Sequence, residues 1–372
     1  MKPFLRILPL LLAMLAAAAR AESATVPLTQ VLDGLKADDP QLGATLDAIA
    51  AEIAKRPEEA ARAVLPALEN PETPAGRLPF YAWAAGVTHS ATVVAPLGQL
   101  LDRPKLPDEA VRACLTALAE TGRSEAGVLL LSRLEKTRDA DRRFILLDHL
   151  AQMKHKPAIP AAMELLKESP DGRNYWRPRL VFGKFGAAAV PALRERLGDK
   201  ERDVRANAVL LLGRWLRATA AAPDFKAHFA EEKDPTLRRM LIIALEATVT
   251  DPAALKPFAE SVQKSDPDEK VRLAAGEMAA GLDEMAVAAA AARGKRKPDS
   301  AVFDREYQTL WRSCGVQGDL KLLKKSGVPG DEPRLLRLRE RILQRNRGEA
   351  FPAHEAVSDI LSWYRLLKGA ER

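Results

Sequence analysis

The sequence lacks the short motifs that mark several common enzyme classes. It contains no His-Glu-x-x-His zinc motif, no Gly-x-Ser-x-Gly nucleophile turn and no phosphate loop ending in Lys-Ser or Lys-Thr. The Gly183-Lys184-Phe185-Gly186 stretch is too short for such a loop, and we interpret it as a helix end where small residues admit close packing. None of the five histidines forms a metal-ligand pair at helical spacing, and His354-Glu355 is interpreted as a surface dipeptide. We therefore expect no enzymatic activity, no cofactor and no metal.

Cysteines and aromatic residues are scarce. The 372 residues include two cysteines and 5% aromatic residues, against 47% hydrophobic and 29% charged residues. This composition is typical of a helical protein rich in alanine and leucine. In an extended helical protein Cys114 and Cys314 would lie far apart, so we expect two separate thiols, unless the C-terminal region folds back and allows a disulfide.

The chain has no apolar run long enough to span a membrane. The longest lies near the N-terminus, from Ile7 to Ala19, and has 13 residues, fewer than the ~20 that a transmembrane helix needs. Basic residues precede it, and Ala19-Arg20-Ala21 follows as a small-x-small cleavage site. Residues 1–21 are therefore predicted to be a signal peptide, cleaved near Ala21 to give an exported, periplasmic or secreted protein. An uncleaved anchor is the alternative.

Repetition is the main feature of the remaining chain. Counting from Val204, apolar residues recur at positions 4, 7, 8 and 11, which is one face of a helix. An acid lies three residues before Val204 and an arginine one residue after it, and the pattern recurs about every 31 to 34 residues. The acid–arginine pairs are Asp108 and Arg112, Glu201 and Arg205, Asp234 and Arg238, and Asp268 and Arg272. Because each acid can cap its helix and lies four residues from its arginine, we expect these pairs to be structural.

A second series of residues keeps the same period. Prolines recur between the copies of the first pattern, at Pro66, Pro96, Pro160, Pro191 and Pro257. Proline inside a helix removes one hydrogen bond, so each is predicted to bend the first helix of a pair. Two such helices per period resemble the HEAT-repeat family of α-solenoids over about residues 57–282. The resemblance implies a right-handed superhelix whose second helices line the concave face, and repeats of this kind must stack to bury their apolar stripes.

The predicted fold is an all-α superhelix, a HEAT-like solenoid with a small helical C-terminal cap. We expect capping helices over residues 22–56, about seven helix pairs over 57–292, a basic linker over 293–300 and a helical region over 301–372. The last region has its own aromatic residues, including Trp311 and Trp363, and matches no family that we know. Its charge also differs, with 18 basic against 11 acidic residues from 293 onward and 36 against 39 over 22–292.

One predicted helix of this basic region carries an arginine stripe. From Pro333 to Arg347, four arginines share one side, next to the apolar Leu335, Leu338 and Ile342. They are the candidate anion-binding residues Arg334, Arg337, Arg341 and Arg345. An acidic protein segment or an envelope phosphate would neutralise the stripe, as would solvent or docking on acids of the last repeats, such as Glu277, Asp283 and Glu284. Nucleic acid is not expected, because export argues against it.

The expected function is a scaffold or adaptor of the bacterial cell envelope that binds a protein or peptide on its concave face. Fold alone does not determine function, and two alternatives remain open. HEAT-repeat proteins include di-iron hydroxylases and enzymes that attach bilins, so a lyase-like or hydroxylase-like repeat protein is one. The other is binding of an anionic envelope polymer by the C-terminal region.

Overall fold

The computed structural model describes residues 26–170, 172–295, 298–313, 317–345 and 351–369. The predicted signal peptide and Cys314 lie outside these residues. Every regular element among them is a helix, which confirms the all-α prediction, and none of these helices is long and apolar enough to cross a membrane. The chain divides into two compact units, residues 1–153 and 154–372.

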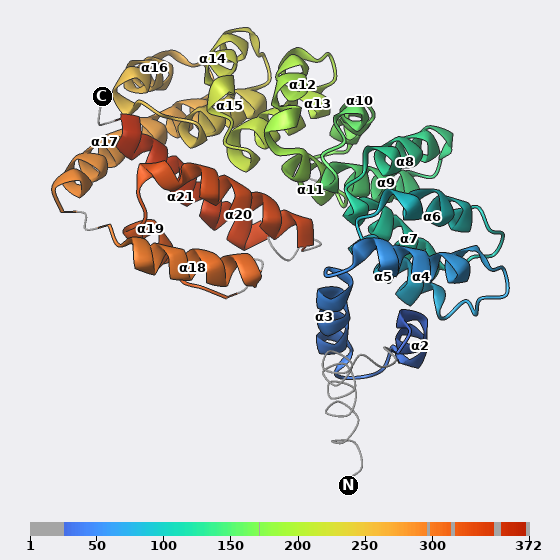
Figure 1. Ribbon diagram of the computed structural model, residues 1–372. Coiled ribbons are helices and arrows are strands. Elements are labelled where there is room, and N and C mark those ends of the chain that lie inside the picture. The colour runs from blue at the N-terminus through green and yellow to red at the C-terminus, as the bar shows by residue number, and fades with distance from the viewer. Residues whose placement is uncertain (1–25, 171, 296–297, 314–316, 346–350, 370–372) are drawn as a thin grey trace. The chain divides into compact units, whose positions relative to one another are not determined.

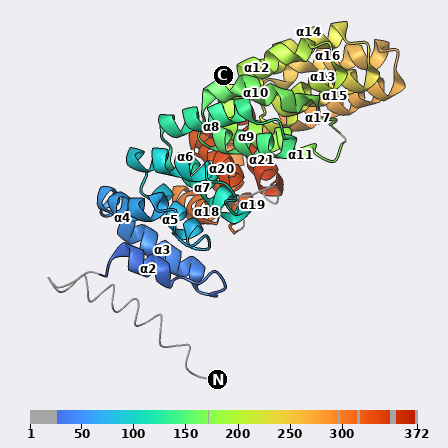
Figure 2. The same cartoon turned by 90° about the vertical axis from the view of Figure 1, so that its right-hand side faces the viewer.

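In the first unit, the helices follow one another as pairs, with α4, α6 and α8 in one row and α5, α7 and α9 in a second row (Figures 1 and 2). We call the second row the second-helix layer. The buried residues of the unit lie largely on the facing sides of the two rows, as the apolar spacing predicts. The helices of this unit are α2 (Leu28–Gly34), α3 (Leu42–Ile53), α4 (Pro57–Glu69), α5 (Leu78–Val87), α6 (Val94–Leu101), α7 (Asp108–Thr121), α8 (Ser124–Lys136) and α9 (Ala140–Gln152).

The second unit continues the alternation and then adds helices that do not belong to the repeats. The repeat helices are α10 (Ile159–Ala162), α11 (Trp176–Phe185), α12 (Val190–Glu195), α13 (Arg202–Leu210), the π-helix η7 (Leu211–Trp215), α14 (Ala222–Glu231), α15 (Pro235–Ala247), α16 (Pro252–Ser265) and α17 (Glu269–Lys295). The C-terminal helices are α18 (Ser300–Arg312), α19 (Leu320–Ser326), α20 (Glu332–Arg345) and α21 (Phe351–Gly369). In several helix pairs a short 3₁₀ turn precedes the first helix. These turns include η2 (Ala91–Val93), η3 (Lys156–Ala158) and η5 (Gly186–Ala189).

The prediction that every recurring proline bends a helix is wrong at three of its five positions. Pro66 and Pro257 do lie inside α4 and α16. Pro160 and Pro191, however, lie at the start of α10 and α12, and Pro96 is the third residue of α6, each just after a 3₁₀ turn. The first N–H groups of a helix have no partner within the helix, so proline costs no hydrogen bond there. At these three positions it marks the point where the α-helix begins.

The repeat arginines connect successive repeats. Arg205 Nε donates to Glu232 Oε2 at 2.8 Å, and Arg238 Nε donates to Asp266 Oδ2 at 3.1 Å. Each of these acids also accepts a backbone N–H two residues further on, from Asp234 and Asp268 respectively. The ion pair therefore joins one repeat to the loop between the two helices of the next repeat, whereas the sequence pattern suggested pairing within one helix.

The same arginines also close their own loops. Arg205 Nη1 donates to the carbonyls of Asp199 and Lys200, and Arg272 Nη1 to those of Asp266 and Pro267. Two of the repeat acids bind backbone N–H groups at the starts of their own helices. Asp234 accepts the N–H groups of Thr236 and Leu237, and Asp268 accepts that of Val271. Asp234 and Asp268 thus cap their helices, as the sequence predicts. The prediction is wrong for Glu201, whose side chain makes no cap hydrogen bond to α13, and for Asp108, which is the first residue of α7 and lies exposed on it with Arg112.

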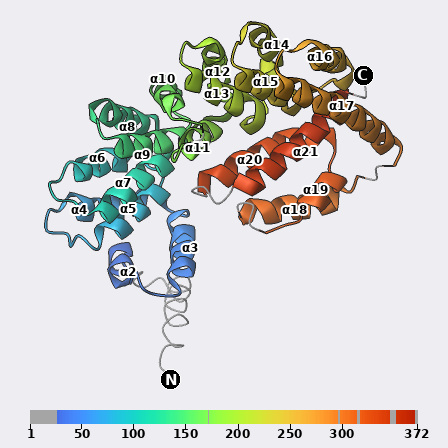
Figure 3. The same ribbon diagram turned by 180° about the vertical axis from the view of Figure 1, so that it is seen from behind.

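The C-terminal helices belong to the same compact unit as the repeats from Lys154 onward, whereas the sequence analysis treats residues 301–372 as a separate cap. Figures 1 and 3 show α20 and α21 beside α11, α13, α15 and α17, and contacts join α20 to α11 and α21 to α17. We call residues 298–369 the C-terminal domain. In this unit the second-helix layer is formed by α11, α13 with η7, α15 and α17. The side of it that the C-terminal domain covers is the candidate functional site.

Candidate functional site

A short π-helix shapes the centre of this surface. After α13, Leu216 N donates to Leu211 O at 2.7 Å and Ala218 N donates to Leu212 O at 2.8 Å, so the last turn is wider than an α-helical turn. The chain then turns at Arg217, whose φ of 49° is unusual for a residue with a side chain. π-Helical turns of this kind often occur at functional sites. Here the turn leaves the carbonyls of Leu216 and Arg217 available to side chains from other helices.

Two arginines of the C-terminal domain bind these carbonyls. Arg339 Nη1 of α20 donates to Leu216 O at 3.0 Å, and Arg365 Nη1 of α21 donates to Arg217 O at 2.7 Å. A cation at a helix C-terminus is favourable, because the last carbonyls carry a partial negative charge. Arg339 is only 5% exposed. Its burial, with a smaller contribution from Arg365, lowers its pKa to about 10, so it still carries its charge at neutral pH.

An aromatic stack lies beside these hydrogen bonds. The rings of Trp215 and His354 are 4.1 Å apart between centroids and inclined by 24°. The expectation that His354 belongs to a surface dipeptide is therefore wrong, since this residue is 1% exposed. Burial holds its pKa well below the usual value, and the positive charges of Arg339 and Arg217 lower it further. His354 is consequently neutral at physiological pH, and its Nδ1 has no hydrogen-bond partner within the described part of the chain.

Ion pairs surround this surface. They join Lys154 to Glu340 at 2.9 Å, Arg217 to Asp359 at 2.6 Å and Arg214 to Glu355 at 3.7 Å. In each pair the acid belongs to the C-terminal domain and the base to the repeats. One hypothesis from the sequence was the opposite arrangement, with the domain docked on acids of the last repeats. One of those acids, Asp283, pairs with Lys256 of α16 instead.

A glycine allows the two parts to approach closely. A methyl group at Gly183 of α11 would clash with the side chain of Leu343 of α20 and would lie 2.7 Å from Trp215 Nε1. Leu343 is buried against this position. The sequence predicts close packing at Gly183, and in the structure the residue that packs there is Leu343 of the C-terminal domain.

Two arginines of the α20 stripe, Arg334 and Arg341, contact α18 of the same domain. Arg334 lies 4.7 Å from the ring centroid of Phe303 and 4.6 Å from that of Tyr307, and it pairs with Asp304 of α18 at 2.7 Å. Arg341 lies 4.5 Å from the ring centroid of Trp311 and donates to its carbonyl at 2.9 Å.

The aromatic residues that these arginines meet form one row along α18. Phe303 and Tyr307 lie 6.1 Å apart between ring centroids, and Tyr307 and Trp311 lie 5.8 Å apart. Arg334 and Arg341 therefore stabilise contacts within the C-terminal domain. Arg337 is exposed, and the side chain of Arg345 lies outside the described residues, so the anion hypothesis now depends on these two.

Trp215 was recognised in the sequence only as an apolar position, and Arg217, Arg339, His354 and Arg365 were missed. The signal for Arg339 was present. It falls between Leu335 and Leu343 on the apolar side of α20, where a charged residue must find a buried partner. On α21, His354, Ser358 and Arg365 likewise form a polar stripe at helical spacing, and the first two are buried.

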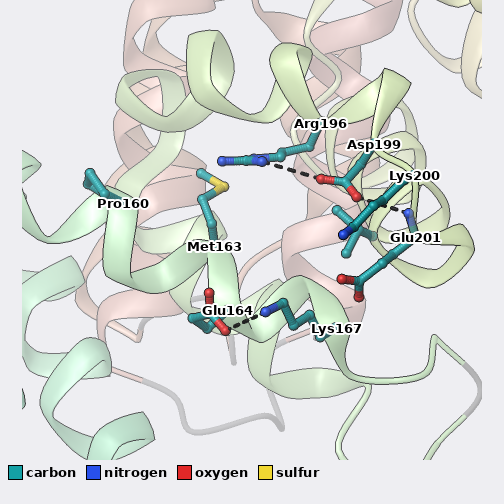
Figure 4. Close-up of a pocket in the computed structure, with 9 residues that line it drawn as sticks. Pro160, Met163, Glu164, Lys167, Arg196, Asp199, Lys200 and Glu201 are labelled. Carbon is teal, nitrogen blue, oxygen red and sulfur yellow. Dashed lines mark hydrogen bonds and ion pairs between the residues drawn. The ribbon is translucent and has the colours of Figure 1, made fainter.

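A hollow lies between η4 (Met163–Lys167) and the start of α13 (Figure 4). Its volume is about 340 Å³. Lys167 pairs there with Glu164 at 2.8 Å, and Arg196 pairs with Asp199 at 3.3 Å, so the charges of the hollow largely neutralise one another. Nothing in this arrangement points to a particular ligand.

The described residues hold no group of three or more His, Cys, Asp and Glu side chains that could bind a metal ion. Cys114 is a buried free thiol, and burial, opposed weakly by Arg103, raises its pKa to about 12. Such a thiol is unreactive at neutral pH.

The comparisons with known proteins agree with the pattern of helix pairs. Residues 190–281 match the family model for HEAT repeats. This part of the chain consists of HEAT repeats. This match covers the repeats from α12 to α17 and includes Trp215 and Arg217, while the C-terminal domain lies outside it.

The other comparisons do not identify a function. No curated protein matches the chain. Among solved structures, it is similar to the complex of CpcE and CpcF of phycocyanin lyase from Nostoc sp. PCC7120, with 19% sequence identity and a TM-score of 0.31. That similarity covers 60% of this chain and 92% of the other. It is too weak to support a statement about function.

Proposed function

We propose that this HEAT-repeat protein is a non-enzymatic scaffold or adaptor of the bacterial cell envelope, which binds another protein through its second-helix layer. The observation that carries this proposal is the surface around Trp215. There the second-helix layer already binds two helices, α20 and α21, through backbone carbonyls, an aromatic stack and ion pairs. Long surfaces of stacked helices commonly bind proteins in this way.

The second-helix layer of the first unit offers a comparable surface. Pro79, Phe80, Trp83 and Val87 lie on one side of α5 and are half-buried, while Ala82 on the opposite side is fully buried. Exposed aromatic side chains are frequent at the centres of protein interfaces. A partner helix or an extended peptide with apolar side chains would fit this row of side chains.

Photo-crosslinking tests the proposal directly. A photoreactive amino acid is placed at Trp83, and a matched control is placed at Val128, which is 62% exposed on the first-helix row of the same unit. We expect a discrete adduct from position 83 that disappears in a Phe80→Asp background, and none from position 128. Equal adducts from both positions would show that the second-helix layer has no special affinity for proteins.

Two further measurements test the remaining parts of the proposal. N-terminal sequencing of the protein from the periplasm or the culture medium should give a chain that begins near Glu22, since the predicted signal peptide would be removed after Ala21. Metal analysis and an absorption spectrum of the purified protein should show neither bound iron nor a visible chromophore. A stoichiometric metal or pigment would favour the lyase-like or hydroxylase-like alternative.

A further inference from the structure

The C-terminal domain has a hydrophobic core of its own. The core includes Phe303, Tyr307, Leu323, Leu338 and Tyr364, and every other side chain that belongs to it or packs against it also lies between Ala292 and Leu367. Among the described residues, the contribution of the repeat helices to this core is Ala292 of α17, which packs against it. The contact with the second-helix layer uses other residues of α20 and α21, so the domain could leave that layer with its core intact.

The contact itself has the features of a reversible interface. Besides the packing of Leu343 at Gly183, it contains two arginine–carbonyl hydrogen bonds, the stack of Trp215 on His354 and three ion pairs at the edge. His354 Nδ1 and Arg217 Nε remain without hydrogen-bond partners among the described residues. Buried polar atoms without partners weaken an interface, and interfaces between parts of one chain with a polar character commonly open and close.

The conformation of Arg217 also favours opening. Its φ of 49° lies in the left-handed region, which is unfavourable for a residue with a side chain. The docked domain supports this conformation from both ends, because Asp359 pairs with the guanidinium and Arg365 binds the carbonyl. The loop can relax when these two contacts are lost.

We propose that α20 and α21 are a removable cover of the second-helix layer, which occupies the surface around Trp215 until a helix of a partner protein replaces it. This proposal rests on the proposed function, that the second-helix layer binds other proteins. The partner segment would be an amphipathic helix that places an arginine on the carbonyl of Leu216, as Arg339 does, and a flat side chain on Trp215. The cover thereby inhibits binding at this surface by occupying it.

Hydrogen exchange measured on the full-length protein without any partner tests this proposal. The test variant combines Glu340→Lys and Asp359→Lys, which reverse two ion pairs at the edge of the contact without touching the core. The matched control is Asp283→Lys, which breaks the exposed pair with Lys256 elsewhere in the same unit. A second variant, Glu340→Lys with Lys154→Glu, restores one pair with its charges exchanged.

In the test variant we expect roughly fivefold faster exchange in peptides that cover η7 and the residues following it, because weaker edge contacts raise the open population. Exchange in peptides from α18 should stay unchanged, since the core of the domain persists. Higher salt should accelerate exchange around η7 in the wild-type protein as well. The control should behave like the wild type, and the charge-exchanged variant should exchange at close to the wild-type rate.

Two outcomes would overturn the proposal. Unchanged exchange around η7 in the test variant would mean that the domain is a permanent part of the repeat surface. Equal acceleration in α18 would mean that the domain unfolds when it is released. If the proposed function is wrong, the crosslinking experiment will give no adduct that depends on Phe80. That result would not change the hydrogen-exchange rates around η7.

Discussion

His354 stacks on Trp215 with 4.1 Å between the ring centroids, although the two residues are 139 positions apart in the chain. The stack joins the C-terminal domain to the end of a repeat helix. It also buries a titratable group between the positive charges of Arg339 and Arg217, with no partner for its Nδ1 within the described residues. The acids of α21 near this point, Glu355 and Asp359, pair with Arg214 and Arg217. Protonation of His354 would therefore add a positive charge beside Arg339 and Arg217.

The first prediction concerns pH. Burial and the neighbouring arginines lower the pKa of His354 in the folded protein below 6.5, the usual value in an unfolded chain. The unfolded state therefore binds the proton more readily, and stability is retained above pH 6.5 and lost as the pH falls below it. The loss is at most about 1.4 kcal/mol for each pH unit. Urea unfolding at pH 7.5 and pH 5 measures it.

The matched variant for this measurement is His354→Phe, which keeps a ring against Trp215 and cannot take up a proton. We expect the wild type to lose more free energy of unfolding than this variant when the pH is lowered from 7.5 to 5. The other histidines contribute equally to both proteins and cancel in the comparison. Identical losses in the two proteins would show that His354 accepts a proton as easily in the folded state as in the unfolded state.

The second prediction separates two neighbouring arginines of α15. Arg238 binds Asp266, which is 8% exposed, and the carbonyls of Glu232 and Lys233, whereas Arg239 is exposed. Arg238→Ala leaves a buried carboxylate without its partner and should lower the free energy of unfolding by about 3 kcal/mol. Arg239→Ala should change it by less than about 0.5 kcal/mol. Chemical unfolding of both variants decides the matter, and equal effects would contradict a structural role for the ion pairs between repeats.

The repeats were predictable because they depend on local patterns. The apolar spacing around Val204, Leu237 and Val271 has the period of a helix, and the acid before each anchor marks a helix start. The acids that receive the arginines were also visible, since Glu232 and Asp266 lie 34 residues apart, at the same period. They were missed because the pattern was followed within single helices, while the hydrogen bonds join a helix to the next repeat.

The contact around Trp215 was not predictable by the same reasoning. It joins residues far apart in the chain, and nothing in the local spacing of α13 announces a π-helical turn or the left-handed conformation of Arg217. His354 was misread because a His-Glu pair near a chain end resembles an exposed segment. The indication that one side of α21 is covered comes from buried residues at helical spacing, such as His354 and Ser358.

The third prediction tests the contacts of the arginine stripe. Arg334 lies against the rings of Phe303 and Tyr307 and pairs with Asp304. Arg334→Ala should therefore lower the free energy of unfolding by about 1–2 kcal/mol, from the loss of cation–π contacts and a partly exposed ion pair. Arg337→Ala, on the same helix and exposed to solvent, should change it by less than about 0.5 kcal/mol. Urea unfolding followed by tryptophan fluorescence compares them.

The same pair of residues tests the anion hypothesis for the C-terminal domain. If an anionic partner binds the stripe, Arg337→Glu should abolish salt-sensitive binding of a polyphosphate or an acidic peptide and leave the unfolding curve unchanged. Arg334→Glu would disturb the fold and is unsuitable for this purpose. Unaltered binding by the Arg337→Glu protein would remove the exposed part of the stripe from consideration.

The last prediction concerns the close approach of two repeats beside the contact. A methyl group at Gly213 of the π-helix would lie 2.7 Å from Ala244 Cα of α15 and would clash with the Ala244 side chain. Because the obstacle includes backbone, it cannot move aside without shifting a helix, and Gly213→Ala should destabilise the protein by about 1–3 kcal/mol. The shift would also displace Trp215, two residues further on, and so weaken its stack on His354.

Gly281→Ala is the control for this substitution. Gly281 lies in α17, and a methyl group there would meet only Glu246 Oε1, at 3.1 Å, which is the end of a flexible side chain. Alanine is favoured over glycine inside a helix by about 0.5–1 kcal/mol, so this variant should be as stable as the wild type or more stable. Thermal unfolding of both variants gives the comparison, and near-ultraviolet circular dichroism reports on the packing of Trp215. A Gly213→Ala protein as stable as Gly281→Ala, with an unchanged aromatic signal, would show that the second helices do not approach as closely as this packing requires.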